Sequence, residues 1–418
     1  MKGTPILLVT VALLALTACA SPTSVNPTQL SSSDQVETVV AATMQALPTN
    51  TPAAIRPESP AEMLPHTLYY LSNDGIYRRE NGTLLTQVYR MERDGKTITR
   101  LTDEPNGVDG YDVSIIDGTV AFIADNQLAL INADGSNRRV LVDGGSEKLE
   151  YNPYFYKDPV SEPVFSPDGQ TIAYAHQNKS VVLYDVASGI SNVIIKNDKI
   201  HVGNWPVRYS PDGTKLLIAL GQWENPPKYT VYDIETGVLT QSSEEQRFFC
   251  CSALVWSLDG SSFYGIVRAI QNAYQVGAIQ RVDAATGTVT ILFPFIAGNP
   301  VSEIMNSPSS PYFAPDGWLY YFFGSYRLDS GYYEPPVIQL IRSAPDGITN
   351  RIVLRDENFV LMNEALWAPD ASFVIVSMTP SRDWNQNQGS GVLELYYTDA
   401  QKSVVLLASF GYQMKWGP

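Results

Sequence analysis

A five-residue pattern, aromatic-Ser-Pro-Asp-Gly, constrains the fold of this chain more than any other feature. It is intact at 165–169 and 209–213, and it recurs in slightly altered form at 256–260, 313–317 and 367–371, with a shortened copy at 116–118. The five longer copies begin 44 to 57 residues apart. Self-similarity at such a period is typical of an architecture built from repeated supersecondary units.

The chemistry of the pattern is that of a tight hairpin turn. Proline presets φ, aspartate accepts hydrogen bonds from nearby backbone donors, and glycine takes the positive φ that closes the turn. A β-rich run follows the longer copies each time, at 171–175, 216–220, 263–267, 319–323 and 373–377. These runs predict buried central strands.

A second series of turns gives an independent count of the repeats. It occurs seven times, most clearly at 184–189, 232–237 and 282–287, and also at 93–95, 132–135, 345–347 and 398–401. Strand-like segments such as 191–195, 289–293 and 404–408 come after these turns. Each unit is therefore expected to contain four strands joined by two hairpins of this kind.

The earliest unit lacks the first of its two hairpins, because it begins directly at the strand-like segment 67–71. The missing part is found at the other end, where 413–418 resembles a first strand and half of its turn. A ring of four-stranded sheets needs such a join so that no sheet edge is left open. We predict an all-β, seven-bladed propeller over 63–418, closed by the C-terminal strand in the first blade. Six or eight blades fit the count less well.

The repeats resemble those of the TolB-like propellers, whose WD40-like repeat carries the same aromatic-Ser-Pro-Asp-Gly turn. The resemblance covers nearly all of 66–418, and it implies a fold and no particular activity. TolB itself has six blades behind an N-terminal α/β domain. Since the repeats here number seven and no such domain precedes them, a role in the Tol system is not implied.

The N-terminus has the pattern of an export signal. Lys2 precedes an apolar run from Ile6 to Leu16 that is too short to cross a bilayer. The run ends in Leu-Thr-Ala-Cys at 16–19, which resembles the bacterial lipobox. We expect 1–18 to be a signal peptide and Cys19 to be lipidated, so that the protein is exported and anchored to a membrane. The alternative is an ordinary secretory signal.

Residues 19–62 are rich in Ser, Thr, Pro and Ala and offer too few large apolar side chains for a core. This composition predicts a tether. Within it, Asp34 can cap a short helix over 34–47 that Pro48 ends.

The charge of the chain narrows the classes of partner, and its cysteines limit the disulfides it can form. The net charge is −15 and there is no basic stripe, which argues against nucleic acid and anionic lipid as partners. The adjacent Cys250 and Cys251 can form only a strained disulfide. We therefore expect one of these side chains to be buried and the other to face outward. The propeller is expected to be monomeric.

Long connections rich in Tyr, Trp and Arg are predicted to lie on one face of the propeller, opposite the short Asp-Gly turns. Rigid scaffolds commonly carry binding residues on loops of this kind. We expect this face to bind a protein, peptide or glycan of the cell envelope, unless the aromatic residues only pack their own loops onto the blades. The candidate binding residues are Tyr154, Tyr156, Trp205, Trp223, Tyr326, Arg327, Tyr332, Tyr333, Arg382 and Trp384.

Catalytic signals are weak. The sequence has no Gly-x-Ser-x-Gly motif, and His66, His176 and His201 have no metal-ligand spacing. We therefore predict no catalytic residue, no metal and no cofactor. Carboxylates from separate blades can still converge on a central channel, for instance Glu162 with Glu303 or Glu364. The alternative function is an extracytoplasmic propeller enzyme or solute-binding protein that uses this channel.

Overall fold

The chain divides into two compact units, Met1–Glu58 and Ser59–Pro418, and every described residue lies in the second. The computed structural model describes residues 62–73, 85–196, 202–222, 225–242, 254–271, 274–292, 304–327, 337–379 and 391–418. The predicted signal peptide 1–18, Cys19, the tether as far as 61 and the helix over 34–47 lie outside these residues.

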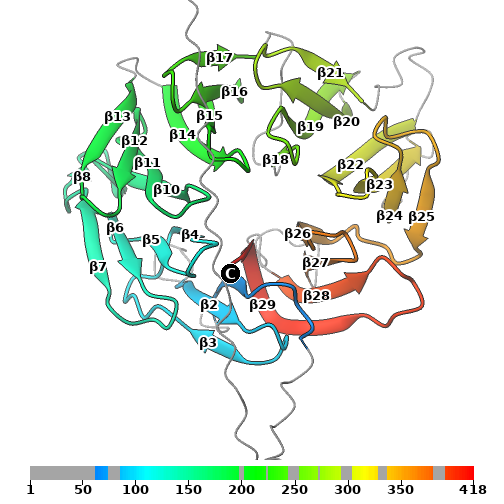
Figure 1. The fold of residues 1–418 in the computed structure, drawn as a ribbon, viewed down its shortest axis with the longest axis horizontal. Coiled ribbons are helices and arrows are strands. Elements are labelled where there is room, and N and C mark those ends of the chain that lie inside the picture. Colours follow the sequence, from blue (N-terminus) through cyan, green and yellow to red (C-terminus); the bar gives the residue numbers. More distant parts are fainter. Residues whose placement is uncertain are drawn as a thin grey trace, which may run out of the picture. The chain divides into compact units, whose positions relative to one another are not determined.

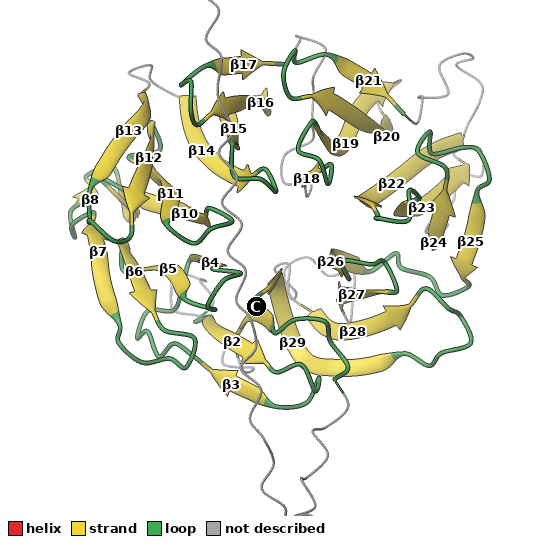
Figure 2. Ribbon diagram, in the orientation of Figure 1, coloured by secondary structure: helices red, strands yellow, loops and turns green. Residues whose placement is uncertain are grey.

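Over the described ranges, every regular element is a β-strand (Figure 2). The all-β prediction is confirmed for this part of the chain. It contains no helix of the length and hydrophobicity needed to cross a membrane.

Five sheets each contain four consecutive antiparallel strands. The first two consist of β4 (Gly110–Val113), β5 (Val120–Ala124), β6 (Gln127–Ile131) and β7 (Arg139–Asp143), and of β10 (Val160–Phe165), β11 (Thr171–His176), β12 (Ser180–Asp185) and β13 (Ser191–Lys196). The third consists of β14 (Val202–Tyr209), β15 (Lys215–Gln222), β16 (Asn225–Asp233) and β17 (Leu239–Gln241). The last two consist of β18 (Val255–Trp256), β19 (Ser262–Gln271), β20 (Tyr274–Asp283) and β21 (Val289–Ile291), and of β22 (Ile304–Phe313), β23 (Leu319–Arg327), β24 (Ile338–Ser343) and β25 (Ile352–Arg355).

A sixth sheet has seven strands in the order β26-β27-β28-β29-β1-β2-β3, so it joins the two ends of the second unit. Its strands are β26 (Met362–Trp367), β27 (Phe373–Met378), β28 (Gly391–Tyr397), β29 (Val405–Trp416), β1 (Leu68–Ser72), β2 (Gln87–Met91) and β3 (Ile98–Arg100). A separate two-stranded sheet, β8 (Lys148–Leu149) and β9 (Asn152–Tyr156), lies between β7 and β10 in sequence.

Strand β29 belongs to both halves of this large sheet. Its first part pairs with β28, from Leu395↔Val405 to Gly391↔Gly411, and its last part pairs with β1, as in Leu68↔Trp416. The sequence predicted two separate segments, 404–408 and 413–418, whereas the structure has one continuous strand. Gly411 permits this, because a Cβ there would lie 2.6 Å from Leu393 Cδ1 and 2.9 Å from Tyr70 Cδ2.

The recurrent pattern forms the expected turn. At 165–169 the Asp168 carboxylate accepts hydrogen bonds from the Ser166 hydroxyl (2.6 Å) and the Gln170 amide (3.0 Å). Gly169 has a φ of +71°, a conformation that costs glycine little and most other residues more. The same aspartate contacts recur at Asp212 and Asp259. The strands that follow are the buried central strands the sequence predicted.

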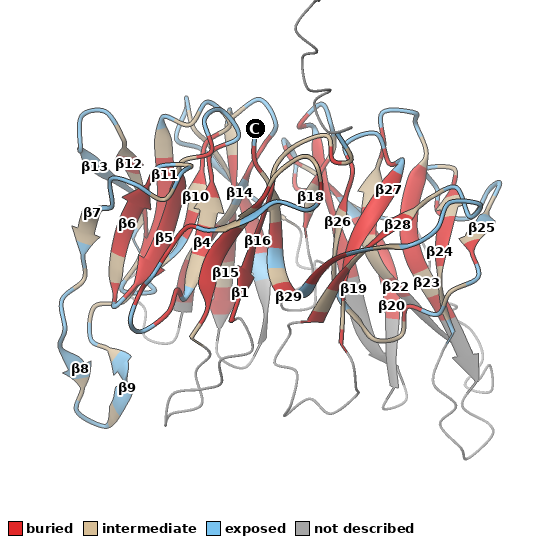
Figure 3. Cartoon of the chain, turned by 90° about the horizontal axis from the view of Figure 1, so that it is seen from below, coloured by how far each residue is buried: buried red, intermediate tan, exposed pale blue. Residues whose placement is uncertain are grey.

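The hydrophobic core lies between neighbouring sheets. One cluster joins Tyr69 and Leu71 of β1 to Val120 and Phe122 of β5, and others join later pairs of sheets in the same way. In Figure 3 the buried residues run through the middle of the sheets, and the exposed ones lie mainly in the turns. Because each sheet packs on the next, the sheets follow one another around a common centre (Figure 1). The first strands, such as β4, β10, β14 and β26, lie nearest that centre.

Candidate functional site

The β8–β9 hairpin carries the most exposed aromatic side chains of the described residues. Tyr151, Tyr154 and Phe155 are 85%, 67% and 58% exposed. Figure 3 shows the hairpin projecting beyond the edge of the sheets. Large apolar side chains that are exposed together are typical of contact surfaces. We call these three residues the hairpin aromatics.

Polar contacts hold the hairpin in shape. At its base, Lys157 Nζ lies 2.9 Å from Glu147 Oε2, and the Lys157 amide donates to the Glu147 carbonyl. Above them, Lys148 Nζ lies over the ring of Tyr156, 2.8 Å from its centroid, a cation–π contact. Tyr156 is thus partly covered, while the hairpin aromatics face solvent. The arrangement presents three aromatic side chains on an ordered support.

The structure brings only some of the predicted binding residues together. Tyr154 and Tyr156 share strand β9. Trp205 lies in β14 and not in a connection, and its ring packs closely over the backbone at Gly203 and Gly221. Tyr326 and Arg327 end β23, and their side chains are not described. Outside the described residues are Trp223, Tyr332, Tyr333, Arg382, Trp384, Glu303, His201, Cys250 and Cys251.

The aromatic stretch 151–156 was expected on the binding face, but Tyr151 and Phe155 were not among the candidate binding residues. The available signal was the density of aromatic residues, four within 151–156, in a connection longer than its counterparts.

A second feature is a group of charged residues near the centre of the ring. Asp112 (β4), Glu162 (β10), Arg208 (β14), Glu364 (β26) and Lys415 (β29) interact electrostatically across five strands. We call these five residues the central cluster. Glu162 and Glu364 were candidates for a channel-facing pair, and both are found here.

Bulges in the first strands place several of these residues. The pairing register shifts between Ser161 and Val164 in β10 and between Pro206 and Arg208 in β14. Glu162 and Gln413 have φ values of +53° and +51°, which are unusual for residues other than glycine. A bulge redirects a side chain locally, so these irregularities are part of how the cluster is assembled.

Two members of the central cluster, Asp112 of β4 and Glu364 of β26, bind residues of β29. Lys415 Nζ lies 2.6 Å from Asp112 Oδ1, and the other oxygen of Asp112 accepts from the Phe165 amide at 2.6 Å. The Glu364 carboxylate accepts from the amides of Gln413 (2.5 Å) and Met414 (2.9 Å). The C-terminal strand is therefore held by side chains from β4 and β26 as well as by its pairing with β1.

Burial and neighbouring charges shift the pKa values of three residues of the central cluster. Burial raises the pKa of Glu364 to about 7, although the two amides, Lys415 and Arg208 act in the opposite direction. Burial also raises the pKa of Glu162, with Lys415 opposing it, and lowers the pKa of Arg208, with Asp112 and Glu364 opposing it. Glu162 and Arg208 nevertheless have exposed surface.

The raised pKa of Glu364 predicts a pH-dependent stability. An acid whose folded-state pKa exceeds its unfolded value stabilises the fold below the unfolded pKa, and this contribution is lost as pH rises through the folded pKa. The window therefore runs from about 4.5 to about 7. In urea titrations across it, the free energy of unfolding of the wild type should fall relative to that of Glu364→Gln. A constant difference between the two proteins would contradict this.

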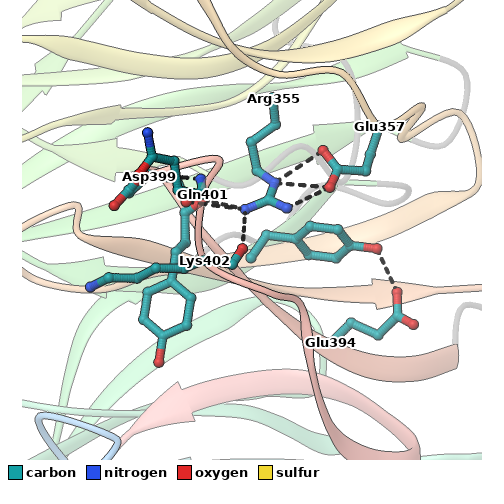
Figure 4. Close-up of polar contacts among 8 residues, drawn as sticks. Arg355, Glu357, Glu394, Asp399, Gln401 and Lys402 are labelled. Atoms are coloured by element: carbon teal, nitrogen blue, oxygen red, sulfur yellow. Dashed lines mark hydrogen bonds and ion pairs between the residues drawn. The ribbon is translucent and has the colours of Figure 1, made fainter.

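Another buried charge has a structural role. Arg355 ends β25, is 5% exposed, and donates to the Glu357 carboxylate and to the carbonyls of Tyr397, Asp399 and Lys402 (Figure 4). It links one sheet to the β28–β29 turn of the next. Since its guanidinium is occupied by these acceptors, it offers nothing to a ligand.

Among the described residues, no three His, Cys, Asp or Glu side chains are grouped so that they could hold a metal ion.

Comparison with known proteins shows the fold class. No protein-family model and no curated protein matches this sequence. Among solved structures, an oligogalacturonate lyase in complex with manganese has a TM-score of 0.51 at 13% identity, over 83% of this chain and 86% of the lyase. A prolyl endopeptidase structure gives 0.51 at 13% identity over 83% of this chain, which spans about half (50%) of that enzyme.

TolB from Acinetobacter baumannii is more distant, with a TM-score of 0.40 at 14% identity over 80% of this chain and 79% of TolB. At the identities of the lyase and the endopeptidase, the similarity establishes a fold and not an activity. The described part of the chain thus has a β-propeller fold.

Proposed function

We propose that this protein is a membrane-anchored, extracytoplasmic lipoprotein whose propeller recognises a protein, peptide or glycan without catalysing a reaction. The observation that carries the proposal is the β8–β9 hairpin. Its three aromatic side chains are exposed to water in the isolated protein. A partner that buries them removes this apolar surface from water, which favours binding.

The hairpin suits this role for two reasons. Its backbone is paired and its base is held by an ion pair, so little conformational entropy is lost when the aromatics become buried. Tyrosine also combines an apolar ring with a hydroxyl group, which fits polar partners such as glycans and peptides.

We also infer that the sheets form seven blades and that β29 closes the ring. The five four-stranded sheets account for five blades. The seven-stranded sheet divides at β29 into two further groups of four, if the part of β29 beyond Gly411 is counted with β1. This division agrees with the seven turns of the second series.

Replacing Tyr151, Tyr154 and Phe155 together with serine tests the recognition surface. We expect capture of the partner from detergent-solubilised membranes to fall at least tenfold, since each buried aromatic contributes about 1–3 kcal/mol. The measurement is quantitative mass spectrometry of proteins and glycans retained by the lipidated full-length chain.

The matched control replaces Ile116, Ile190 and Leu258, three similarly exposed apolar residues in turns, with serine. This variant should capture the partner as well as the wild type. If both triple variants retained the same partners in the same amounts, the hairpin would not be the recognition surface.

A second candidate function is an extracytoplasmic enzyme or solute-binding protein that uses the centre of the ring. The convergence of charged residues from five strands favours it. Turnover of a substrate that is lost in Glu364→Gln and kept in the hairpin variant would support this candidate over the first.

A further inference from the structure

Asn126 holds both ends of the segment that carries the β8–β9 hairpin. It lies in the β5–β6 turn and is 2% exposed. Its Nδ2 donates to the carbonyls of Gly145 (2.9 Å), just before β8, and of Asp158 (3.1 Å), just after β9. Its Oδ1 accepts from the Val160 amide at 2.8 Å, and its own carbonyl accepts from the Gly144 amide at 3.0 Å. One buried residue therefore joins the two stems of the hairpin.

The two stems also pack closely around Asn126. A Cβ on Gly144 would lie 2.4 Å from Asn126 Nδ2 and 2.7 Å from the Asp158 carbonyl oxygen, so no larger residue fits there without a shift. The second stem is held by the next sheet as well. In the β11–β12 turn, the Gln177 amide donates to the Pro159 carbonyl (2.7 Å), and Gln177 Nε2 donates to Asp158 Oδ1 (2.7 Å). The base of the hairpin is thereby fixed to two neighbouring sheets.

The conformation of the β5–β6 turn does not by itself account for these contacts. Asp125 and Asn126 have φ values of +49° and +64°, which suit a two-residue hairpin turn and which asparagine tolerates. The β11–β12 turn has similar φ values at Gln177 and Asn178, +58° and +52°, yet Asn178 is exposed. The turn therefore explains why asparagine is accepted at 126, and the contacts with the two stems explain why its side chain is buried.

We propose that Asn126 is the positioning residue of the β8–β9 hairpin, and that its contacts fix the direction in which Tyr151, Tyr154 and Phe155 are presented to a partner. This inference rests on the proposed role of the hairpin in recognition. A long connection takes many conformations unless other groups hold it. Here both donors and the acceptor of one side-chain amide hold its two ends. The aromatics are therefore ordered before a partner binds, and less conformational entropy is lost on binding.

The test combines hydrogen–deuterium exchange with partner capture, both on the full-length protein. Asn126→Gly removes the side chain and keeps a residue that adopts a positive φ at little cost. We expect backbone amides within 144–160 to exchange at least tenfold faster in this variant, because the stems lose the groups that hold them. The amides of β5, β6 and β11 should exchange as they do in the wild type. Capture of the partner should fall at least threefold.

Three further variants are matched to this one. Asn178→Gly makes the same change in the β11–β12 turn, and it should leave both exchange within 144–160 and capture unchanged. Gly144→Ala introduces a Cβ that meets Asn126 and Asp158, and it should speed exchange in the same segment. Gly110→Ala is the control for that variant, because a Cβ at Gly110 meets nothing within 4 Å. Thermal unfolding verifies that each variant is folded.

The proposal is overturned if exchange within 144–160 is no faster in Asn126→Gly than in Asn178→Gly, or if exchange rises equally throughout the sheets. It is also overturned if capture falls in the serine triple variant of the hairpin and is unchanged in Asn126→Gly. Capture that persists in the triple variant contradicts the proposed function instead. In that case the exchange measurement still decides whether Asn126 holds the hairpin.

Discussion

Cys19→Ser is expected to move the protein from the membrane fraction to the soluble fraction. Each buried CH₂ of an acyl chain contributes about 0.8 kcal/mol to membrane attachment, and a lipidated cysteine of the lipobox type carries several chains. Without them the apolar run over 6–16 cannot hold the protein in the membrane, because it is too short to span a bilayer. The released protein should still contain a folded propeller, since every described residue belongs to the second unit.

Fractionation and intact-mass measurement check this prediction. The wild type should carry the mass of the acyl chains on a chain that begins at Cys19. Cys250→Ser is the matched control, because it removes another thiol and should leave the protein in the membrane fraction. A Cys19→Ser protein that remained with the membranes would exclude lipid anchoring and would leave the fold unaffected.

Removing residues 412–418 is expected to abolish cooperative folding of the propeller. The deletion removes the strand segment that pairs with β1 and the Lys415–Asp112 ion pair. It also removes the hydrogen bonds that two backbone amides donate to Glu364. It also removes Met414, which is buried in a cluster with residues of β1, β27 and β28. Loss of one such side chain costs about 2–5 kcal/mol, a large part of the roughly 5–15 kcal/mol that stabilises a typical domain.

Two single substitutions in β29 give a graded form of the same experiment. Met414→Ala should lower the free energy of unfolding by about 2–5 kcal/mol. Leu406 lies in the part of β29 that pairs with β28, and its side chain is exposed. Leu406→Ala should therefore change the free energy of unfolding by less than about 0.5 kcal/mol. Thermal and urea unfolding measure both. A shortened chain that unfolds as cooperatively as the wild type, at the same temperature, would rule out closure by β29.

Much of the fold follows from local chemistry that the sequence displays. A turn such as 165–169 needs only its own proline, aspartate and glycine, and the strand after it needs only a run of β-branched and aromatic residues. These signals act within a few residues, so the strand positions and the pairing of neighbouring strands can be predicted. The role of 413–418 beside β1 could be anticipated because the first unit lacked a strand.

The binding residues were harder to predict. The aromatic density at 151–156 pointed to the hairpin, but which of those side chains remain exposed depends on contacts such as that of Lys148 with Tyr156. Most of the other candidates, such as Trp223 and Trp384, lie outside the described residues, and their role remains a prediction.

The sequence by itself determined the repeated unit, the central strands and the composition of a tether and lipobox before them. Only the tertiary structure decided that Asp112 meets Lys415, 303 residues away, and that the Glu364 carboxylate accepts the amides of Gln413 and Met414. The physical reason is that the sheets follow one another around a common centre. Their first strands come together there, and no local pattern in the sequence records which side chains meet.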